Sequence, residues 1–219
     1  MKKRSLLSAI AFTLGLISAG SANAFSISMI GDNDFAIFSG TATGINNILY
    51  QNDKVWMDQI PALSTLTFAL PAGDTMFYVL AMGGSGEEDI SGTVNGVNMT
   101  SSSVSVQMSQ DISSFLTGYN LSAVTNGTYD VFLADAQAAF SQSIWGTPEI
   151  NNFQTVIQAG GFGSGFRFDD STAHLFRFNA SDVRVGGGGG SNDVPEPASL
   201  ALLGLGLVGL VASRRRKTA

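Results

Sequence analysis

The sequence predicts a mostly-β domain, an antiparallel β-sandwich with one or two short helices. Three observations support this prediction. Many short segments alternate apolar and polar residues, Gly, Asn and Asp gather between them, and helical spacing is confined to the middle of the chain. Alternation of this kind is typical of strands with one buried face. The expected strands are 25–30, 35–38, 48–50, 55–57, 66–70, 75–82, 90–94, 97–99, 104–108, 153–158, 166–168, 175–178 and 183–185.

The clearest strand signals lie in the first half of the domain. Residues 66–70 alternate large apolar and small side chains, which gives a strand two unlike faces. Residues 75–82 form a near-continuous apolar run, which predicts a central strand buried on both faces. Asn95-Gly96 lies between two strand segments, and this dipeptide predicts a tight hairpin turn.

Helical spacing occurs in the middle of the domain. Residues 129–144 place apolar side chains four positions apart, at Phe132, Ala136, Phe140 and Ile144. This pattern predicts a helix, and its alternative is a buried loop with one helical turn. A second, shorter helix is expected at 111–116, capped by Ser109 or Asp111.

The N-terminus has the pattern of a secretory signal peptide. Basic residues at 2–4 precede an apolar stretch at 6–17, and Ala22-Asn23-Ala24 is a small-x-small cleavage site. Signal peptidase is therefore expected to remove residues 1–24 and leave Phe25 as the mature start. The alternative is a buried N-terminal helix.

An ordered series of signals ends the chain. A glycine-rich linker at 186–193 leads to Val194-Pro195-Glu196-Pro197, whose prolines keep the segment extended, as a protease active site requires. Residues 198–212 are apolar, but as a helix they would span only about 22 Å, less than the hydrocarbon core of about 30 Å. A basic stop-transfer cluster then stays on the cytoplasmic side; it contains Arg214, Arg215, Arg216 and Lys217.

These C-terminal residues resemble the PEP-CTERM sorting signal. The resemblance covers 194–217, where the Pro-Glu-Pro motif, a short transmembrane helix and the Arg-rich end occur in order. It implies an exported protein of a Gram-negative bacterium, which a membrane-embedded exosortase cuts near the motif. It also implies a transient stay in the inner membrane before delivery to the cell surface or outside. The alternative is an ordinary single-pass anchor with a proline-containing stem.

Charge separates sharply along the chain. Between 25 and 193 there are four basic and 16 acidic residues, so the expected domain at 25–185 and its linker carry a formal charge of −12. This charge excludes nucleic acid and anionic lipid as partners bound through a basic patch. It suits divalent cations and neutral sugars. The chain has no cysteine, so its stability depends on packing and not on disulfides.

The sequence offers little for catalysis, and we expect no enzymatic activity. His174 is the only histidine, and no Gly-x-Ser-x-Gly motif is present. A zinc centre cannot form without cysteines or further histidines. Residues 204–209 match Gly-x-Gly-x-x-Gly, but they lie in the apolar tail with no preceding strand. A glycosidase pair of turn carboxylates, about 5 Å apart, is the enzymatic alternative.

Carboxylates at predicted strand ends are candidate ligands for a structural calcium ion, which takes 6–8 oxygens. No other cofactor is expected. The alternative is that these acids are solvated turn residues, since no Asp-x-Asp-x-Asp-Gly loop is present. Asp169-Asp170 lies at a further strand end. The candidate ligands are Asp32, Asp34, Glu87, Glu88 and Asp89.

Aromatic side chains are candidate sugar contacts, because their faces pack against sugar rings beside polar hydrogen-bonding groups. The candidates are Tyr50, Trp56, Tyr119 and Trp145. One stretch also resembles jelly-roll domains of the galactose-binding type. It runs through Asp-Asn-Asp-Phe-Ala-Ile-Phe at 32–38, Trp56, Thr-Phe-Ala-Leu-Pro-Ala-Gly-Asp at 67–74 and Tyr-Val-Leu-Ala at 78–81. The resemblance implies a jelly-roll-like sandwich.

The sequence therefore predicts a routed, non-enzymatic protein. We expect a β-sandwich exported to the cell surface or to the extracellular polysaccharide matrix and processed at its C-terminal signal. The first alternative is a lectin-like, carbohydrate-binding module stabilised by calcium, and the second is a glycan-active enzyme.

Overall fold

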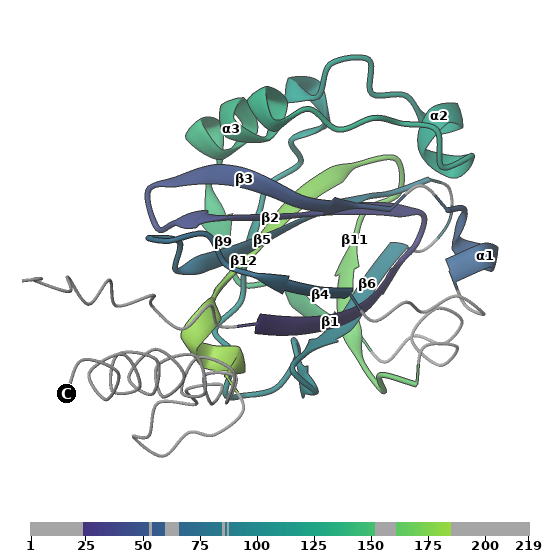
Figure 1. Ribbon diagram of the computed structural model, residues 1–219. Helices are drawn as coiled ribbons and strands as arrows, with labels where there is room; N and C mark the ends of the chain where they lie inside the picture. The colour runs from purple at the N-terminus through teal and green to yellow at the C-terminus, as the bar shows by residue number, and fades with distance from the viewer. Residues whose placement is uncertain are drawn as a thin grey trace, which may run out of the picture.

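A computed structural model describes residues 24–52, 54–59, 66–84, 86, 88–151 and 161–184. Two antiparallel sheets pack face to face, and helices cover the outer face of one of them (Figure 1). The predicted mostly-β sandwich is confirmed. The expected signal peptide, linker, Pro-Glu-Pro segment and apolar tail helix lie outside the described residues.

In the described part of the chain each sheet has six strands, and every pairing is antiparallel. The first sheet has the order β10 (Glu149–Asn151), β11 (Gly165–Phe168), β6 (Glu88–Val94), β1 (Ala24–Gly31) and β4 (Leu66–Ala69), with β7 (Val97–Asn98) paired to β6. The second has the order β3 (Gly44–Gln51), β2 (Asp34–Thr41), β5 (Met76–Met82), β12 (Ala173–Asn179), β8 (Gln107–Ser109) and β9 (Trp145–Gly146).

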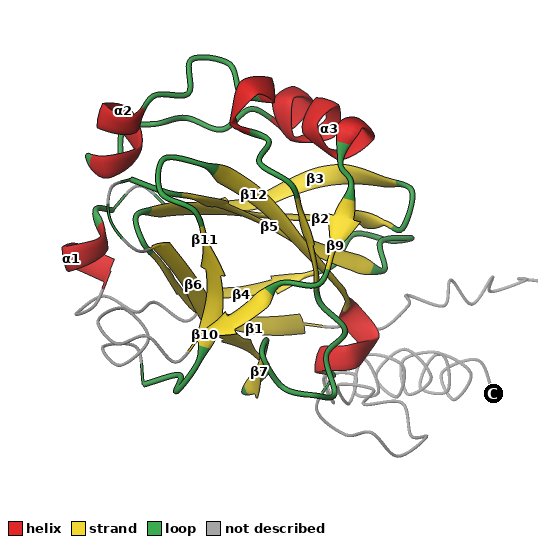
Figure 2. Ribbon diagram, turned by 180° about the vertical axis from the view of Figure 1, so that it is seen from behind, coloured by secondary structure: helices red, strands yellow, loops and turns green. Residues whose placement is uncertain are grey.

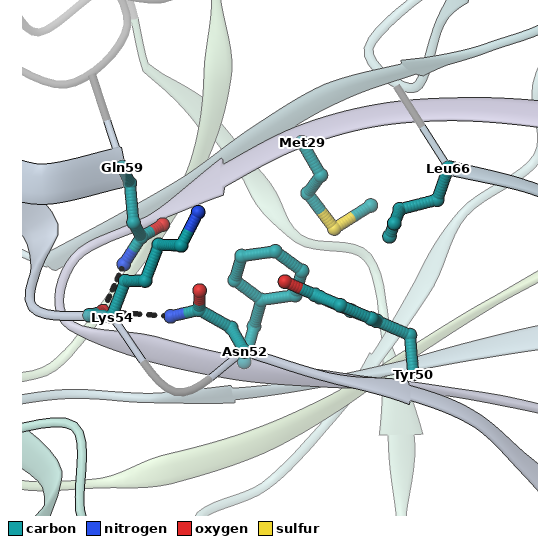
Figure 3. Close-up of a pocket in the computed structure, with 7 residues that line it drawn as sticks. Met29, Tyr50, Asn52, Lys54, Gln59 and Leu66 are labelled. Atoms are coloured by element: carbon teal, nitrogen blue, oxygen red, sulfur yellow. Dashed lines mark hydrogen bonds between the residues drawn. The ribbon is translucent and has the colours of Figure 1, made fainter. Parts of the chain in front are cut away.

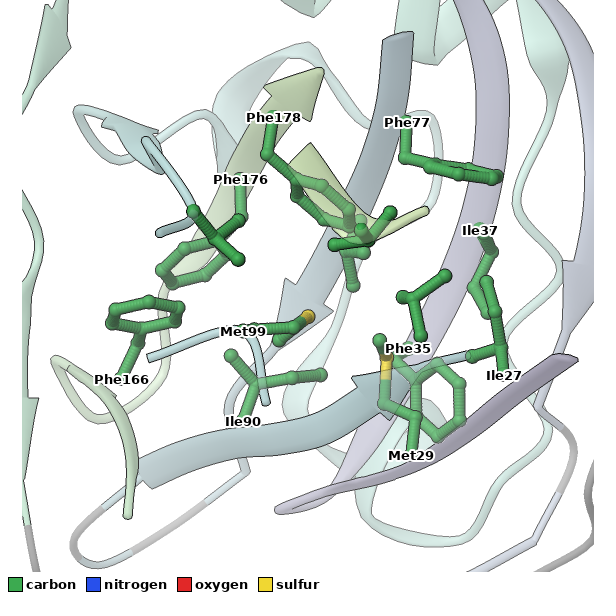
Figure 4. Packing of buried hydrophobic residues seen from close by; sticks show 14 of the residues in the cluster. Ile27, Met29, Phe35, Ile37, Phe77, Ile90, Met99, Phe166, Phe176 and Phe178 are labelled. Carbon is green, nitrogen blue, oxygen red and sulfur yellow. The ribbon is translucent and has the colours of Figure 1, made fainter. Parts of the chain in front are cut away.

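The main core lies between the two sheets and is rich in phenylalanine (Figure 4). Phe77 of β5 lies 4.9 Å from Phe25 and 5.6 Å from Phe178, measured between ring centroids. Phe166 of β11 stacks on Phe176 of β12 at 5.5 Å. The Phe25–Phe77 and Phe166–Phe176 contacts join strands of opposite sheets, so these aromatic rings hold the sandwich together.

A second core lies between the outer face of the second sheet and the helices α2 (Leu121–Thr125) and α3 (Leu133–Gln142), which Figure 2 shows from behind. β5 contributes to both cores, and all of its residues are buried. This confirms the prediction of a central strand buried on both faces. Tyr78 of β5 meets Phe140 of α3 edge to face at 5.6 Å.

The predicted helix at 129–144 is confirmed but shorter. Phe132 is the extended N-cap residue of α3, and Ser143 ends the helix. The end residues of the predicted stripe, Phe132 and Ile144, are 55 % and 76 % exposed. Ala136 and Ala139 are the fully buried residues of α3, because small side chains allow its backbone to approach the sheet closely.

Three local predictions are wrong or altered. The expected strand at 55–57 falls instead at the helix α1 (Trp56–Gln59). The expected strand at 183–185 begins within the 3₁₀ helix η2 (Ala180–Val183). The helix expected at 111–116 is a 3₁₀ turn, η1 (Ser113–Phe115). In each case the apolar run was too short to distinguish strand from helix.

No helix among the described residues is long and apolar enough to cross a membrane. The expected strand at 153–158 lies outside the described residues.

Candidate functional site

Three loops meet at one end of the sandwich and carry most of the predicted acidic ligands. They are the β1–β2 turn, the β5–β6 loop and the β11–β12 turn. The N–H of Asp32 donates to the carbonyl of Asp89 at 2.9 Å, and the N–H of Asn33 donates to Met82 at 3.1 Å. The N–H of Gly83 donates to the carbonyl of Thr172 at 2.8 Å. Backbone hydrogen bonds therefore join the three loops into one frame, which we call the acidic end.

Gln59 of α1 fixes the β1–β2 turn from outside the sheets. Its Oε1 accepts from the N–H of Gly31 at 3.1 Å. Its Nε2 donates to the carbonyls of Asn33 at 2.6 Å and Lys54 at 3.1 Å. Gln59 is 3 % exposed, so these bonds are shielded from water. No sequence signal identified this residue, because its role depends on a distant turn.

Glu88, the first residue of β6, is the most unusual side chain of the acidic end. It is 0 % exposed, and neither of its carboxylate oxygens has a hydrogen-bond partner among the described residues. Burial raises the pKa of Glu88 to about 8. The negative charge of Asp32 adds to this rise, the N–H of Gly84 opposes it, and Asp170 and Asp89 add smaller contributions.

The other predicted acidic ligands divide into two groups. Asp32 is half-buried at the acidic end, and burial raises its pKa to about 6. Asp89 is 3 % exposed and lies opposite Arg167 in the register of β6 and β11. Asp34, in contrast, starts β2 and accepts from the N–H of Phe35 at 2.8 Å and from the amide of Asn52 at 3.1 Å. Glu87 lies outside the described residues.

The structure thus brings Asp32, Glu88 and Asp89 to one place, together with Asp170. In the part of the chain that the structure describes, no group of three or more His, Cys, Asp or Glu side chains could hold a metal ion by itself. Any cation at the acidic end would therefore need oxygens from the loop backbone as well.

His174 of β12 is held in place by hydrogen bonds. Its Nδ1 lies 3.0 Å from the carbonyl of Ser109, and its Nε2 lies 2.9 Å from the hydroxyl of Thr172. The side chain is 5 % exposed, and its ring lies 5.7 Å from the ring of Phe168. Both ring nitrogens are thus occupied by neighbours in the fold.

The predicted sugar contacts lie in different places. Tyr50 is on β3 and Trp145 on β9, which are opposite edges of the second sheet. Trp145 packs under the guanidinium of Arg177, whose Cζ lies 3.9 Å from the ring centroid. The hydroxyl of Tyr119 donates inward, to the carbonyls of Gly83 at 3.2 Å and Thr172 at 2.9 Å. The side chain of Trp56 lies outside the described structure, and sugar binding stays a prediction.

A small pocket opens beside Tyr50, between the two sheets (Figure 3). It has room for about one water molecule. The pocket is therefore too small for a sugar ring in this conformation. The residues that line it are Met29, Phe35, Tyr50, Asn52, Lys54, Gln59 and Leu66.

Comparison with known proteins identifies the C-terminal segment. Residues 193–217 match the family model described as the PEP-CTERM protein-sorting motif. The chain carries a PEP-CTERM sorting signal. This confirms the resemblance seen in Pro195, Glu196 and Pro197, and it indicates export and processing by a membrane-associated exosortase. No curated protein and no solved structure matches the chain.

Proposed function

We propose that this chain is an exported, non-enzymatic protein that an exosortase sorts to the cell surface or to the extracellular polysaccharide matrix. The observation that carries the proposal is the PEP-CTERM motif at 193–217. The predicted signal peptide at 1–24 agrees with it, since both signals belong to one export route.

The route follows from the chemistry of the two ends. The signal peptide starts export, and signal peptidase leaves Phe25 as the mature start. The apolar segment 198–212 then holds the protein in the membrane, with the basic cluster at 214–217 on the cytoplasmic side. Exosortase cuts near Pro195, Glu196 and Pro197, which the prolines keep extended.

A structural role for the domain is supported by the way its reactive groups are used. Both nitrogens of His174, the only histidine of the chain, are within hydrogen-bonding distance of Ser109 and Thr172. Asp34 and Asp74 accept hydrogen bonds that fix strands and turns. These side chains stabilise the fold, which is the role expected of them in a structural surface or matrix protein.

The test is the intact mass of the protein in the culture medium and in the washed membranes of its host. We expect a released form that begins at Phe25 and ends near Pro195. A Pro195→Ala/Glu196→Ala variant should keep the tail and stay in the membrane fraction. The matched control is Ser191→Ala/Asn192→Ala in the same linker, which should be processed normally.

Two results would contradict the proposal. The first is a wild-type membrane form that still carries Arg214 to Lys217, which would make the protein a plain anchored one. The second is normal processing of the Pro195→Ala/Glu196→Ala variant. The released protein can then be applied to a glycan array, where specific binding would favour the lectin-like alternative over a purely structural role.

A further inference from the structure

Glu88 carries a buried carboxylate for which the described part of the fold provides no hydrogen-bond partner. Its side chain is 0 % exposed, and both carboxylate oxygens lack a hydrogen-bond partner among the described residues. The nearby amide of Asn33 is satisfied when its oxygen accepts from the N–H of Gly84 at 2.9 Å and its NH₂ donates to Asp32 at 3.2 Å. Buried carboxylates in proteins are normally paired, hydrogen-bonded or bound to a metal ion.

The charges that act on Glu88 are all negative. They come from Asp32 in the β1–β2 turn, Asp170 in the β11–β12 turn and the adjacent Asp89. Two turns that are distant in sequence and the neighbouring residue therefore direct the same sign of charge at one buried group. Such an arrangement favours a cation, because a bound positive charge would remove the mutual repulsion.

Two glycines allow the β5–β6 loop to pack directly against the side chains of the acidic end. A Cβ on Gly83 would lie 2.9 Å from Cγ of Glu88 and 3.2 Å from its Cδ. A Cβ on Gly84 would lie 1.8 Å from the amide group of Asn33. Any other residue at either position would move the side chains of the acidic end. The glycines thus let the backbone at Gly83 pack against Glu88 and the backbone at Gly84 pack against Asn33.

The frame around this space is fixed by hydrogen bonds. The hydroxyl of Ser171 donates to the carbonyl of Gly84 at 3.2 Å. The hydroxyl of Tyr119 donates to the carbonyls of Gly83 and Thr172. The carbonyl oxygens of Gly83 and Gly84 each accept one of these bonds and keep a second lone pair. Two backbone oxygens of the β5–β6 loop are therefore held in fixed positions at the acidic end.

We propose that the acidic end binds a calcium ion, with Glu88 and Asp32 as its carboxylate ligands and with loop carbonyl oxygens and water completing the coordination. Asp170 and Asp89 contribute negative charge from nearby. The donors are all oxygens in an irregular arrangement of loops, which suits Ca²⁺ with its 6–8 flexible ligands. Mg²⁺ requires a near-ideal octahedron, and zinc prefers nitrogen and sulfur donors.

This inference is independent of the sorting proposal, because its residues lie in the body of the protein. It is tested by thermal unfolding of the full chain in mild detergent, with EDTA or with 10 mM CaCl₂. Sites in extracellular modules bind calcium with Kd of about 10⁻⁴–10⁻³ M. At 10 mM such a site raises the unfolding midpoint by about 3–10 °C. Isothermal titration calorimetry gives a second readout that does not depend on unfolding.

The decisive variant is Glu88→Gln, which keeps the size of the side chain and can donate from its amide to neighbouring carboxylates. It should fold and lose the calcium-induced rise in the unfolding midpoint. If Glu88→Gln is unstable, Asp32→Asn takes its place and should lose the same rise. The matched control is Asp130→Asn, since Asp130 is an exposed acid on the loop before α3. That variant has the same net charge as Glu88→Gln and should keep the full calcium shift.

Three results would overturn the proposal. The first is a wild-type protein whose midpoint and calorimetric trace do not respond to calcium. The second is a Glu88→Gln or Asp32→Asn variant that retains the full shift. The third is an equal shift with 10 mM MgCl₂, which would reject calcium as the specific ligand.

Discussion

Asp74 is the residue whose removal tests the hydrogen-bond network of the β4–β5 turn. Its Oδ2 accepts from the hydroxyl of Ser39 at 2.5 Å and from the amide of Asn47 at 3.0 Å. Its Oδ1 accepts from the amide of Asn46 at 2.6 Å. One carboxylate thereby links this turn to both strands of the β2–β3 hairpin.

The Asp74→Ala variant should lose about 2 kcal/mol of unfolding free energy. Ser39 is 0 % exposed, so its hydroxyl would be left buried and unpaired, which costs about 1–3 kcal/mol. Asn46 is exposed and Asn47 partly exposed, so water can replace their lost bonds. A loss of this size lowers the unfolding midpoint by about 4–8 °C, which circular dichroism at pH 7 can measure.

A double-mutant cycle with Ser39→Ala identifies the cause. If the buried hydroxyl explains the loss, Ser39→Ala should be much less costly in the Asp74→Ala background than in the wild type. The expected coupling is about 1 kcal/mol or more. Strict additivity of the two substitutions would refute the reasoning.

The same network predicts a pH dependence. Burial alone would raise the pKa of Asp74, but the hydrogen bonds from Ser39, Asn46 and Asn47 together lower it below its ordinary value of 3.8. A carboxyl with a lowered folded pKa stabilises the fold above its unfolded pKa and loses that contribution as pH falls through the folded value. The stability difference between wild type and Asp74→Ala should therefore shrink below about pH 4, and a constant difference down to pH 2 would contradict this assignment.

Three further substitutions test the packing and the caps. Gly40→Ala should destabilise by about 1–3 kcal/mol, because a Cβ there would lie 2.1 Å from the carbonyl oxygen of Gly44; Gly44→Ala, which meets nothing within 4 Å, is the control for thermal unfolding. Gln59→Ala should cost about 2–3 kcal/mol and speed amide hydrogen exchange in the β1–β2 turn, since it removes three hydrogen bonds. Asn120→Ala removes the side-chain N-cap of α2 and should cost about 1 kcal/mol in urea unfolding.

Most of the sandwich was predictable because alternation and burial coincide. The alternating segment at 25–30 became β1, and the apolar run at 75–82 became β5, which is buried in the main core on one face and under the helices on the other. The turn at Asn95-Gly96 joins β6 and β7 as expected. Each of these signals lies within a few consecutive residues, and the predicted element forms from those same residues.

The failed predictions concern segments whose structure depends on distant partners. Val183 is 0 % exposed, as its apolar character suggested, but it lies in a 3₁₀ turn. Trp56 and Met57 looked like strand residues, while the helix they form ends in Gln59, whose partners lie near residue 31. Neither the spacing of the residues nor the composition of the chain reveals these long-range hydrogen bonds.

The acidic end was only partly visible in the sequence. Clustering of acids at predicted strand ends identified Glu88 and Asp32, because neighbouring antiparallel strands bring their turns together. Sequence could not show that Asp34 faces Asn52 or that Glu88 is fully buried. Both facts depend on which face of a strand a residue occupies within the packed sandwich.

The topology separates the acidic end from both ends of the described domain. β1 begins at Ala24 and ends beside Asp32, whereas β12 begins after Asp170 and runs back to Asn179. The side chain of Asn95 bonds to both ends of the domain, accepting from the N–H of Ser26 at 2.8 Å and donating to the carbonyl of Val183 at 3.1 Å. Both described chain ends therefore leave the sandwich opposite the acidic end (Figure 1).

This separation predicts that calcium binding and tail processing are independent. The Pro195→Ala/Glu196→Ala variant should keep the full calcium-induced rise in unfolding midpoint, and Glu88→Gln should be cut normally at the Pro-Glu-Pro segment. Each variant is then measured in both assays, by unfolding in EDTA and calcium and by intact mass. A loss of processing in a well-folded Glu88→Gln protein would mean that the acidic end takes part in sorting.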